Sequence, residues 1–284
     1  MKTSIKFQTT TLLVIPLVLA CFALLPSVQA VTPAPDGAYP GLNTAEGANA
    51  LLSLTTGTFN TALGGSALKF DTTGSSNTAV GGQALLHNNG DMNTAVGANA
   101  LVNNTFGSFN MALGQAALGA NTSGGSNTAM GFQALASNNG DANVAVGFAA
   151  LKANTDGLDN TAAGTSALFS NITGDGNTAT GFSALAGNVI GSGNTATGDG
   201  ALSGGDGSGS WNTATGLSAL SFAGNRNTAD GAFALYINTG SQNTALGYLA
   251  GGNLTTGNNN IDIANVGVAG ESNTTRIGSG HSIV

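Results

Sequence analysis

A short pattern, Asn-x-Ala-x-Gly with Thr usually in second place, recurs along almost the whole chain of 284 residues. The Asn that opens each copy stands at positions 43, 60, 77, 93, 110, 127, 143, 160, 177, 194, 212, 227 and 243, and a degenerate copy starts at Asn260. Uninterrupted self-similarity at this period indicates a repeat architecture in which each unit buries its apolar face against its neighbours.

The length of the unit varies in one part only. The number of residues is constant from the Gly before each Asn to the Leu that closes the motif. The number from that Leu to the next Gly varies; it is largest from Leu202 to Gly209 and smallest from Leu220 to Gly224. A segment of constant length keeps register with its neighbours, and a segment of variable length is typical of a surface loop. We therefore predict a registered part and one surface loop in each unit.

Each unit is predicted to be a coil of a β-solenoid. The chain has 45 Gly, and two of them per unit oppose a helix, whereas short extended stretches between Gly and Asn suit strands and turns. Charged residues make up 7% and apolar residues 41%, which is not the composition of a disordered chain. The prediction is an all-β fold, a parallel β-solenoid (β-roll) of about 13–14 short coils over 43–259, after a linker or cap at 31–42 and before degenerate coils and a tail at 260–284.

The core follows from the alternation of side chains along a strand. The position after the repeated Ala accepts Glu46 and Asp230, so it faces outward and the Ala faces inward. A second Ala and the following Leu are equally regular and are placed inside with it. The predicted core residues are Ala79, Leu85, Ala95, Leu101, Leu118, Leu135, Leu151 and Leu168.

The repeated Asn has two compatible interpretations. Its amide both donates and accepts, so Asn residues stacked in successive coils can bond to one another as a ladder. Alternatively, Asn is present to make a turn, because it tolerates left-handed backbone angles.

The outward face of the strands forms a flat and mostly apolar strip. Monomers rarely leave such a strip in water, so we expect it to contact another chain of the same kind. The candidate interface residues are Thr78, Val80, Thr94, Val96, Leu113, Met130, Val144 and Val146.

Residues 1–30 have the features of a signal peptide. Lys2 and Lys6 precede an apolar run that ends in a small-residue cleavage site at Ala30. A membrane anchor is disfavoured by Pro16 and the short run, and lipidation of Cys21, the only cysteine, is the other alternative. We expect a secreted or cell-surface bacterial protein without disulfides, whose mature chain carries four basic and thirteen acidic residues; this balance disfavours nucleic acid as a partner.

The repeats resemble the heads of YadA-like trimeric autotransporter adhesins. Residues 93–97 (NTAVG) and 177–181 (NTATG) match the strand pattern of that family, and Asn260 and Asn273 open segments spaced 13 apart, closer to the family's coil length than the longer units before them. The resemblance implies a left-handed β-roll that forms homotrimers and binds an extracellular receptor, matrix or glycan. No heptad stalk or membrane-anchoring barrel segment follows the repeats, so we expect a free-standing head.

Candidates for chemistry are sparse, and we expect no enzyme, metal or cofactor. His87 and His281 lie in variable segments, and the closest acids, Asp156 and Asp159, have no supporting base or cation. The Gly-Asp-Gly triplets at 174–176, 198–200 and 205–207 do not recur in every coil as a calcium repeat requires, so turn chemistry is favoured. The isolated Trp211, Tyr236 and Tyr248 are interpreted as packing residues.

Two alternatives to an adhesin remain. Thr-x-Thr occurs in three consecutive units, at 178–180, 195–197 and 213–215, which resembles the flat Thr arrays of ice-binding β-solenoids. A purely structural extracellular role is the other.

Overall fold

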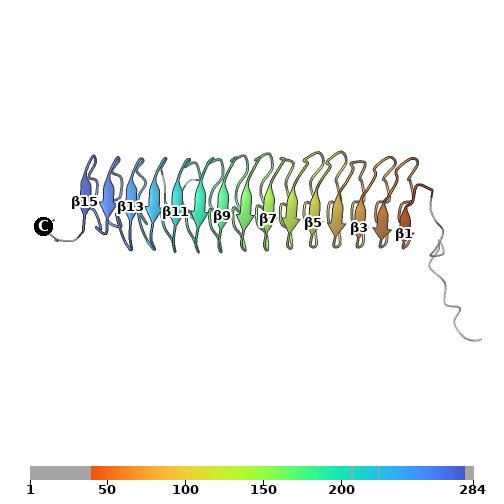
Figure 1. The fold of residues 1–284 in the computed structure, drawn as a ribbon, viewed down its shortest axis with the longest axis horizontal. Coiled ribbons are helices and arrows are strands. Elements are labelled where there is room, and N and C mark those ends of the chain that lie inside the picture. Colours follow the sequence, from red (N-terminus) through yellow and green to blue (C-terminus); the bar gives the residue numbers. More distant parts are fainter. Residues whose placement is uncertain (1–39, 206, 223, 279–284) are drawn as a thin grey trace, which may run out of the picture.

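The computed structural model describes residues 40–205, 207–222 and 224–278, which form one long stack of coils (Figure 1). Fifteen strands of three residues pair in parallel and in sequence order, and the described part contains no helix. The predicted all-β parallel solenoid of about 14 coils is confirmed. The strands are β1 Thr44–Glu46, β2 Thr61–Leu63, β3 Thr78–Val80, β4 Thr94–Val96, β5 Met111–Leu113, β6 Thr128–Met130, β7 Val144–Val146, β8 Thr161–Ala163, β9 Thr178–Thr180, β10 Thr195–Thr197, β11 Thr213–Thr215, β12 Thr228–Asp230, β13 Thr244–Leu246, β14 Ile261–Ile263 and β15 Thr275–Ile277.

The N-terminal predictions lie outside this range. The proposed signal peptide at 1–30, with Cys21, and residues 31–39 of the linker are not among the described residues. Within the described ranges, the structure has no helix with the length and apolar character needed to cross a membrane.

The core is a column of Ala and Leu inside the coils. Neighbouring strands pair residue for residue, so that Ala79 lies against Ala95 and every middle strand residue meets its equivalent. Each of the eight residues assigned to the core from the sequence is fully buried and belongs to the single apolar cluster. A buried Leu contributes roughly 1.5–3 kcal/mol, so the column stabilises each coil mainly through its two neighbours.

The repeated Asn forms a continuous ladder through the stack. Asn127 accepts a hydrogen bond at Oδ1 from the backbone N–H of Asn143 (2.9 Å), and its Nδ2 donates to the carbonyl of Gly140 (2.9 Å). In other coils Nδ2 also donates to the preceding Asn, as from Asn177 to Asn160 (3.0 Å). The positive backbone angle falls on the residue before the Asn, which for Asn127 is Ser126 (φ 59°). The ladder interpretation therefore holds, and the left-handed interpretation of the Asn itself is wrong.

A second buried ladder corrects the surface-loop prediction. The third residue after the core Leu is a buried Asn in eight coils: Asn88, Asn104, Asn121, Asn138, Asn154, Asn171, Asn188 and Asn238. Asn121 donates to the carbonyl of Gly124 (2.9 Å) and to Oδ1 of Asn104 (2.7 Å). The start of the supposed loop is thus inside the solenoid, because this amide satisfies the carbonyl of the corner Gly.

The two glycines of each unit are required by the closeness of the coils. Gly81 has φ 132°, and a Cβ placed there would lie 2.7 Å from the carbonyl carbon of Gly97 in the next coil. At the other corner, a Cβ on Gly74 would lie 2.8 Å from the carbonyl oxygen of Gly90. Side chains at these positions would push neighbouring coils apart, which explains why the Gly spacing is so regular.

Many residues other than Gly also adopt left-handed backbone angles. The core Leu is one of them, with φ 51° at Leu85, and so are the residue two before it and the residue before the ladder Asn, with φ 61° at Gln83 and φ 60° at Ser76. A left-handed residue costs about 1–2 kcal/mol. The stacked backbone bonds, such as Leu85 N–H to the carbonyl of Ala100 (3.0 Å), offset this cost only when coils pair with each other.

The last coils differ from the rest. Asp262 stands where other coils have the inward Ala, is almost fully buried, and finds no hydrogen-bond partner for either carboxylate oxygen among the described residues. Space for it exists because Gly251 replaces the core Leu in the coil before; a Cβ on Gly251 would lie 3.4 Å from Asp262 Oδ2. Burial raises the pKa of Asp262, and the charge of Glu271 raises it further, against the opposing charge of Arg276.

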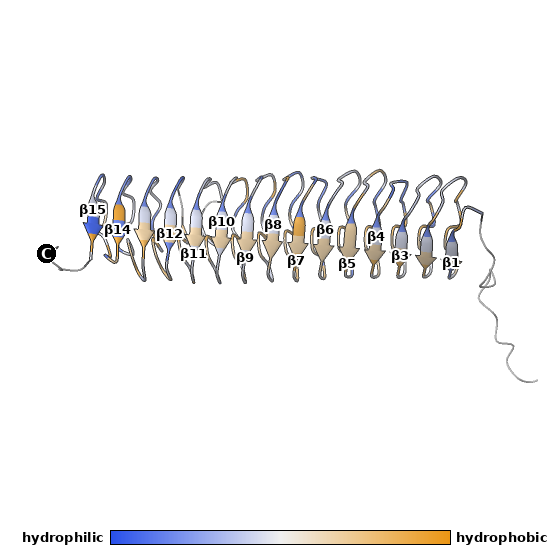
Figure 2. Ribbon diagram, viewed as in Figure 1, coloured by the Kyte–Doolittle hydropathy of each residue, from blue (hydrophilic) through white to orange (hydrophobic). Residues whose placement is uncertain are grey.

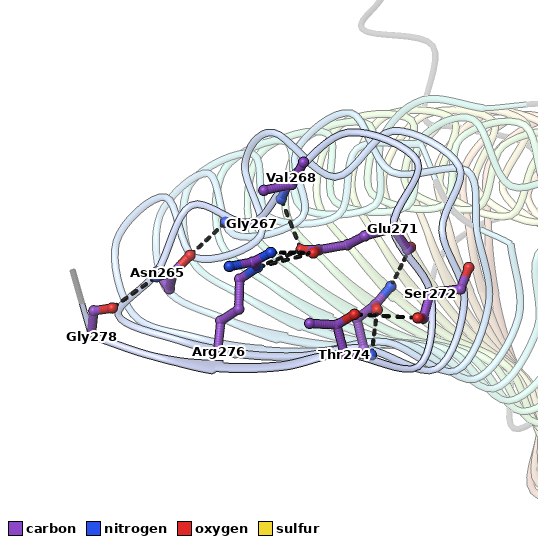
Figure 3. Close-up of polar contacts among 9 residues, drawn as sticks. Asn265, Gly267, Val268, Glu271, Ser272, Thr274, Arg276 and Gly278 are labelled. Atoms are coloured by element: carbon purple, nitrogen blue, oxygen red, sulfur yellow. Dashed lines mark hydrogen bonds and ion pairs between the residues drawn. The ribbon is translucent and has the colours of Figure 1, made fainter. Parts of the chain in front are cut away.

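An ion pair closes the C-terminal end of the solenoid (Figure 3). Arg276 stands at the inward position of β15 and its Nε and Nη2 donate to Glu271 at 2.9 and 2.7 Å. This bond holds the pKa of Glu271 below its ordinary value. The coil that begins at Asn260 has 14 residues, one more than the distance from Asn260 to Asn273, because Thr274 donates its N–H to Asn260 Oδ1 (3.0 Å) and Ile261 pairs with Thr275.

Candidate functional site: the outer face of the sheet

The fifteen strands present one continuous outer face. In β1 to β14 the middle residue is buried while the first and third are half-buried or exposed. All eight candidate interface residues lie on this face. Thr94, Leu113 and Val146 are exposed, and the other five, Thr78, Val80, Val96, Met130 and Val144, are half-buried.

The third strand position makes the face apolar over seven successive strands, β2 to β8. These residues are Leu63, Val80, Val96, Leu113, Met130, Val146 and Ala163. Leu113 is 44% exposed and Val146 is 40% exposed, so the strip is open to solvent in a single chain. In Figure 2, β7 is the most hydrophobic of these seven strands. We call these seven third-position residues, from Leu63 in β2 to Ala163 in β8, the apolar strip.

A Thr array follows the apolar strip. Thr178, Thr195 and Thr213 pair in register across β9, β10 and β11, and the three Thr at 180, 197 and 215 pair likewise. All six are exposed. The array ends at β12, because Asp230 takes the third position there. The pairing of β11 with β12 places Asp230 beside Thr215.

The scattered acids have a structural part in the coil corners. Asp91 accepts from the N–H of Ser75 (2.8 Å), and Asp175, in the first Gly-Asp-Gly triplet, accepts from the N–H of Leu158 (2.8 Å). Ser or Asn fills the same column in other coils. Turn chemistry therefore accounts for Asp175, whereas Asp206 of the third triplet lies outside the described residues.

The structure does not assemble the remaining polar candidates into a site. His87 is exposed and stacks on Phe70 (4.9 Å between ring centres), and His281 lies outside the described residues. Asp156 accepts from the neighbouring Thr155 hydroxyl (3.2 Å). Across the described ranges, no three His, Cys, Asp or Glu side chains come together as potential metal ligands.

A second buried acid, besides Asp262, was not predicted from the sequence. Asp71 occupies the second Asn ladder, is fully buried, and accepts from the N–H of Gly74 (2.8 Å) and from Nδ2 of Asn88 (3.4 Å). Burial raises the pKa of Asp71 to about 6, and these hydrogen bonds oppose the rise. Its signal was the spacing of three residues after Leu68, which it shares with the buried Asn column.

The three aromatic residues interpreted as packing residues differ. Tyr236 and Tyr248 make edge contacts with Phe233, at 5.7 and 6.4 Å between ring centres. Trp211 is 65% exposed and Tyr248 is 70% exposed, so burial explains neither of them.

Comparison of the chain with models of known protein families, with characterised proteins and with solved structures gave no match. The geometry of the outer face therefore carries the functional argument.

Proposed function

We propose that this protein is an exported, non-enzymatic binding module of the adhesin type, and that its apolar strip packs against identical chains in a homotrimer. The observation that supports the proposal is the exposure of the apolar strip along seven consecutive strands. Monomeric proteins rarely leave an apolar surface of this extent in water, and the core of a protein interface is depleted of charge in the same way.

The adhesive role rests on the shape and on the resemblance to adhesin heads. A rigid rod made of repeated coils displays its corner side chains at regular intervals. Association of several rods multiplies each binding surface, and multivalent attachment strengthens weak contacts without new chemistry. The ligand is an extracellular receptor, matrix component or glycan.

The interface is tested by replacing Val80, Val96 and Val146 with Lys. Light scattering should give the mass of one chain for this variant, because three buried charges per chain would face each other across the interface. A matched control places three Lys at Leu86, Val102 and Ala136, which occupy the column where Lys69 and Lys152 occur naturally. The control should keep the oligomeric mass. An unchanged mass for the Val variant, with unchanged circular dichroism, would remove the apolar strip from the interface.

Export is tested separately on protein recovered outside the producing cell. Mass spectrometry should find an N-terminus at or near Val31. Intact residues 1–30 on exported material would contradict the signal-peptide assignment.

The Thr array favours a second candidate function, ice binding. Six exposed Thr hydroxyls and methyls lie in register on a flat sheet face over β9–β11. If this array binds ice, the purified protein should show thermal hysteresis, and Thr197→Lys at its centre should remove it. Equal thermal hysteresis of the wild type and the Thr197→Lys variant would contradict ice binding by this array, and only the adhesin proposal would remain.

A further inference from the structure

The coil lengths change abruptly at one place in the stack. The coil from Asn194 to Trp211 has 18 residues and the next, Asn212 to Arg226, has 15, whereas the other full coils have 16 or 17. The difference lies between Leu202 and Gly209 and between Leu220 and Gly224. The corner just before β11, β12 and β13 keeps its register through this change, since the N–H of Arg226 donates to the carbonyl of Ser210 (3.0 Å). This corner carries an open groove of about 460 Å³, lined by Ser210, Trp211, Asn225, Arg226, Ser241 and Gln242.

Trp211, the only Trp of the chain, forms one wall of the groove. Its indole lies over Gly193 of the preceding coil, where a Cβ would come within 2.6 Å of the ring. Its backbone N–H donates to the carbonyl of Ser192 (2.9 Å), which fixes the position of the residue. The ring is therefore held against the preceding coil on one side and presents its exposed surface to the groove.

Arg226 supplies the charge of the groove. Of the four basic residues in the described part of the chain, Lys69 and Lys152 lie over Phe rings at 4.8 and 5.8 Å, and Arg276 pairs with Glu271. Arg226 alone makes no such contact within that part, although its backbone N–H is anchored to the carbonyl of Ser210 (3.0 Å). The groove of this strongly acidic protein thus combines one unpaired guanidinium, which can bind an anion, with an exposed indole.

The floor of the groove is polar and ordered. Asn225 accepts at Oδ1 from the N–H of Ser210 (2.8 Å), and its own N–H donates to Ser241 Oγ (3.0 Å). This fixes the Asn225 amide with Nδ2 available to donate, next to the amide of Gln242. Ligand sites of this size typically combine an apolar wall with a few oriented polar groups.

We infer that this groove binds an acidic saccharide, with one sugar ring on Trp211 and its carboxylate on Arg226. The apolar face of a pyranose stacks on an indole, and the planar guanidinium pairs with a carboxylate through two parallel hydrogen bonds. The amides of Asn225 and Gln242 bond the ring hydroxyls. This inference names the ligand class for the proposed extracellular binding role and rests on that role, but it is independent of the apolar strip.

Trp211 makes the test direct, because the intrinsic Trp fluorescence of the protein comes from the groove alone. Titration of the wild-type protein with tetragalacturonate should change this fluorescence saturably. Neutral galactotetraose should bind with an affinity at least about tenfold lower. Arg226→Gln should remove the preference for the acidic sugar. Trp211→Ala, followed by calorimetry, should lose binding of both sugars, and Phe106→Ala, an exposed aromatic outside the groove, should change neither.

Two results would overturn the inference. One is the absence of a saturable change at millimolar tetragalacturonate; the other is equal binding of the acidic and neutral sugars by wild-type protein. Light scattering on the same samples separates this outcome from the interface proposal. A monomer that binds the acidic sugar upholds the groove and refutes the interface, and a trimer that does not bind it refutes the groove alone. A lower mass for Trp211→Ala without any sugar binding by wild type would assign the residue to the interface instead.

Discussion

The substitution Asp71→Asn should stabilise the N-terminal coils at neutral pH. Asp71 is a carboxylate at the start of a buried column whose next seven members, from Asn88 to Asn188, are all Asn. Burial raises the pKa of Asp71 from 3.8 to about 6. An Asn at this position can adopt the geometry of Asn104, which donates to Gly107 (2.8 Å) and to Asn88 Oδ1 (2.7 Å). The variant would thus keep an acceptor for Asn88 and gain a donor for the carbonyl of Gly74.

The magnitude follows from proton linkage. The folded-state pKa of Asp71 lies above the unfolded value, so the folded state binds more protons between about pH 4 and pH 6, and stability falls as pH rises through that window. The difference between 3.8 and about 6 corresponds to roughly 3 kcal/mol, which we take as about 2–3 kcal/mol. We expect Asp71→Asn to raise the free energy of local opening by this amount at pH 7.5 and by little at pH 4.

Hydrogen exchange is the appropriate assay, because repeat arrays open locally and a single melting temperature averages over the stack. The gain should appear at the amides of Leu68 and Leu85, which donate to the next coil at 3.0 Å each, and not at Thr178. The control Asp91→Asn changes an exposed acid in the next coil and should stay within about 0.5 kcal/mol. A gain at pH 4 as large as at pH 7.5, or no gain at pH 7.5, would refute the reasoning.

Three further predictions concern the stack. Asn127→Ala leaves the N–H of Asn143 without its buried acceptor, whereas the carbonyl of Gly140 keeps the amide of Asn138 (2.8 Å), so local opening around β6 should become easier by about 1–3 kcal/mol in hydrogen exchange. Gly81→Ala adds a Cβ against the next coil at a backbone angle that L-residues rarely adopt; limited proteolysis should cut between β3 and β4 in the variant and spare the wild type. Since the folded pKa of Glu271 is lowered by Arg276, acid should weaken the C-terminal ion pair below about pH 4.5, and exchange at Gly278, whose N–H donates to the carbonyl of Ile263 (2.8 Å), should accelerate there while Glu271→Gln is fast at every pH.

The sequence predicted what depends on the period. The constant count from Gly to Leu placed Ala79 and Leu85 inside, and the tolerance for Glu46 and Asp230 placed the next position outside, because strand alternation leaves two choices and charge selects one. The ladder of Asn127 and its equivalents was foreseen as one of two interpretations. The sequence did not decide between them, since both use the same residue at the same spacing.

Features that depend on the path of the corners were not predicted. The buried Asn88 column was hidden within a stretch interpreted as a variable loop, although its distance from the core Leu is constant. Nothing in the pattern indicated that Leu85 has a left-handed backbone, because branched aliphatic residues rarely adopt it and only the stacked bonds enforce it. The groove at Trp211 and Arg226 was missed because Trp211 was interpreted as a packing residue and Arg226 belongs to the next coil, so that only the stacking of the coils brings the two together.

The most direct test of the account is the mass of the folded, unmodified protein in solution. Multi-angle light scattering should give three times the mass of one chain and the same value over a tenfold range of dilution, because the proposed homotrimer would cover the apolar strip. A concentration-independent mass of a single chain would contradict the central claim, since the strip from Leu63 to Ala163 would then be left in water.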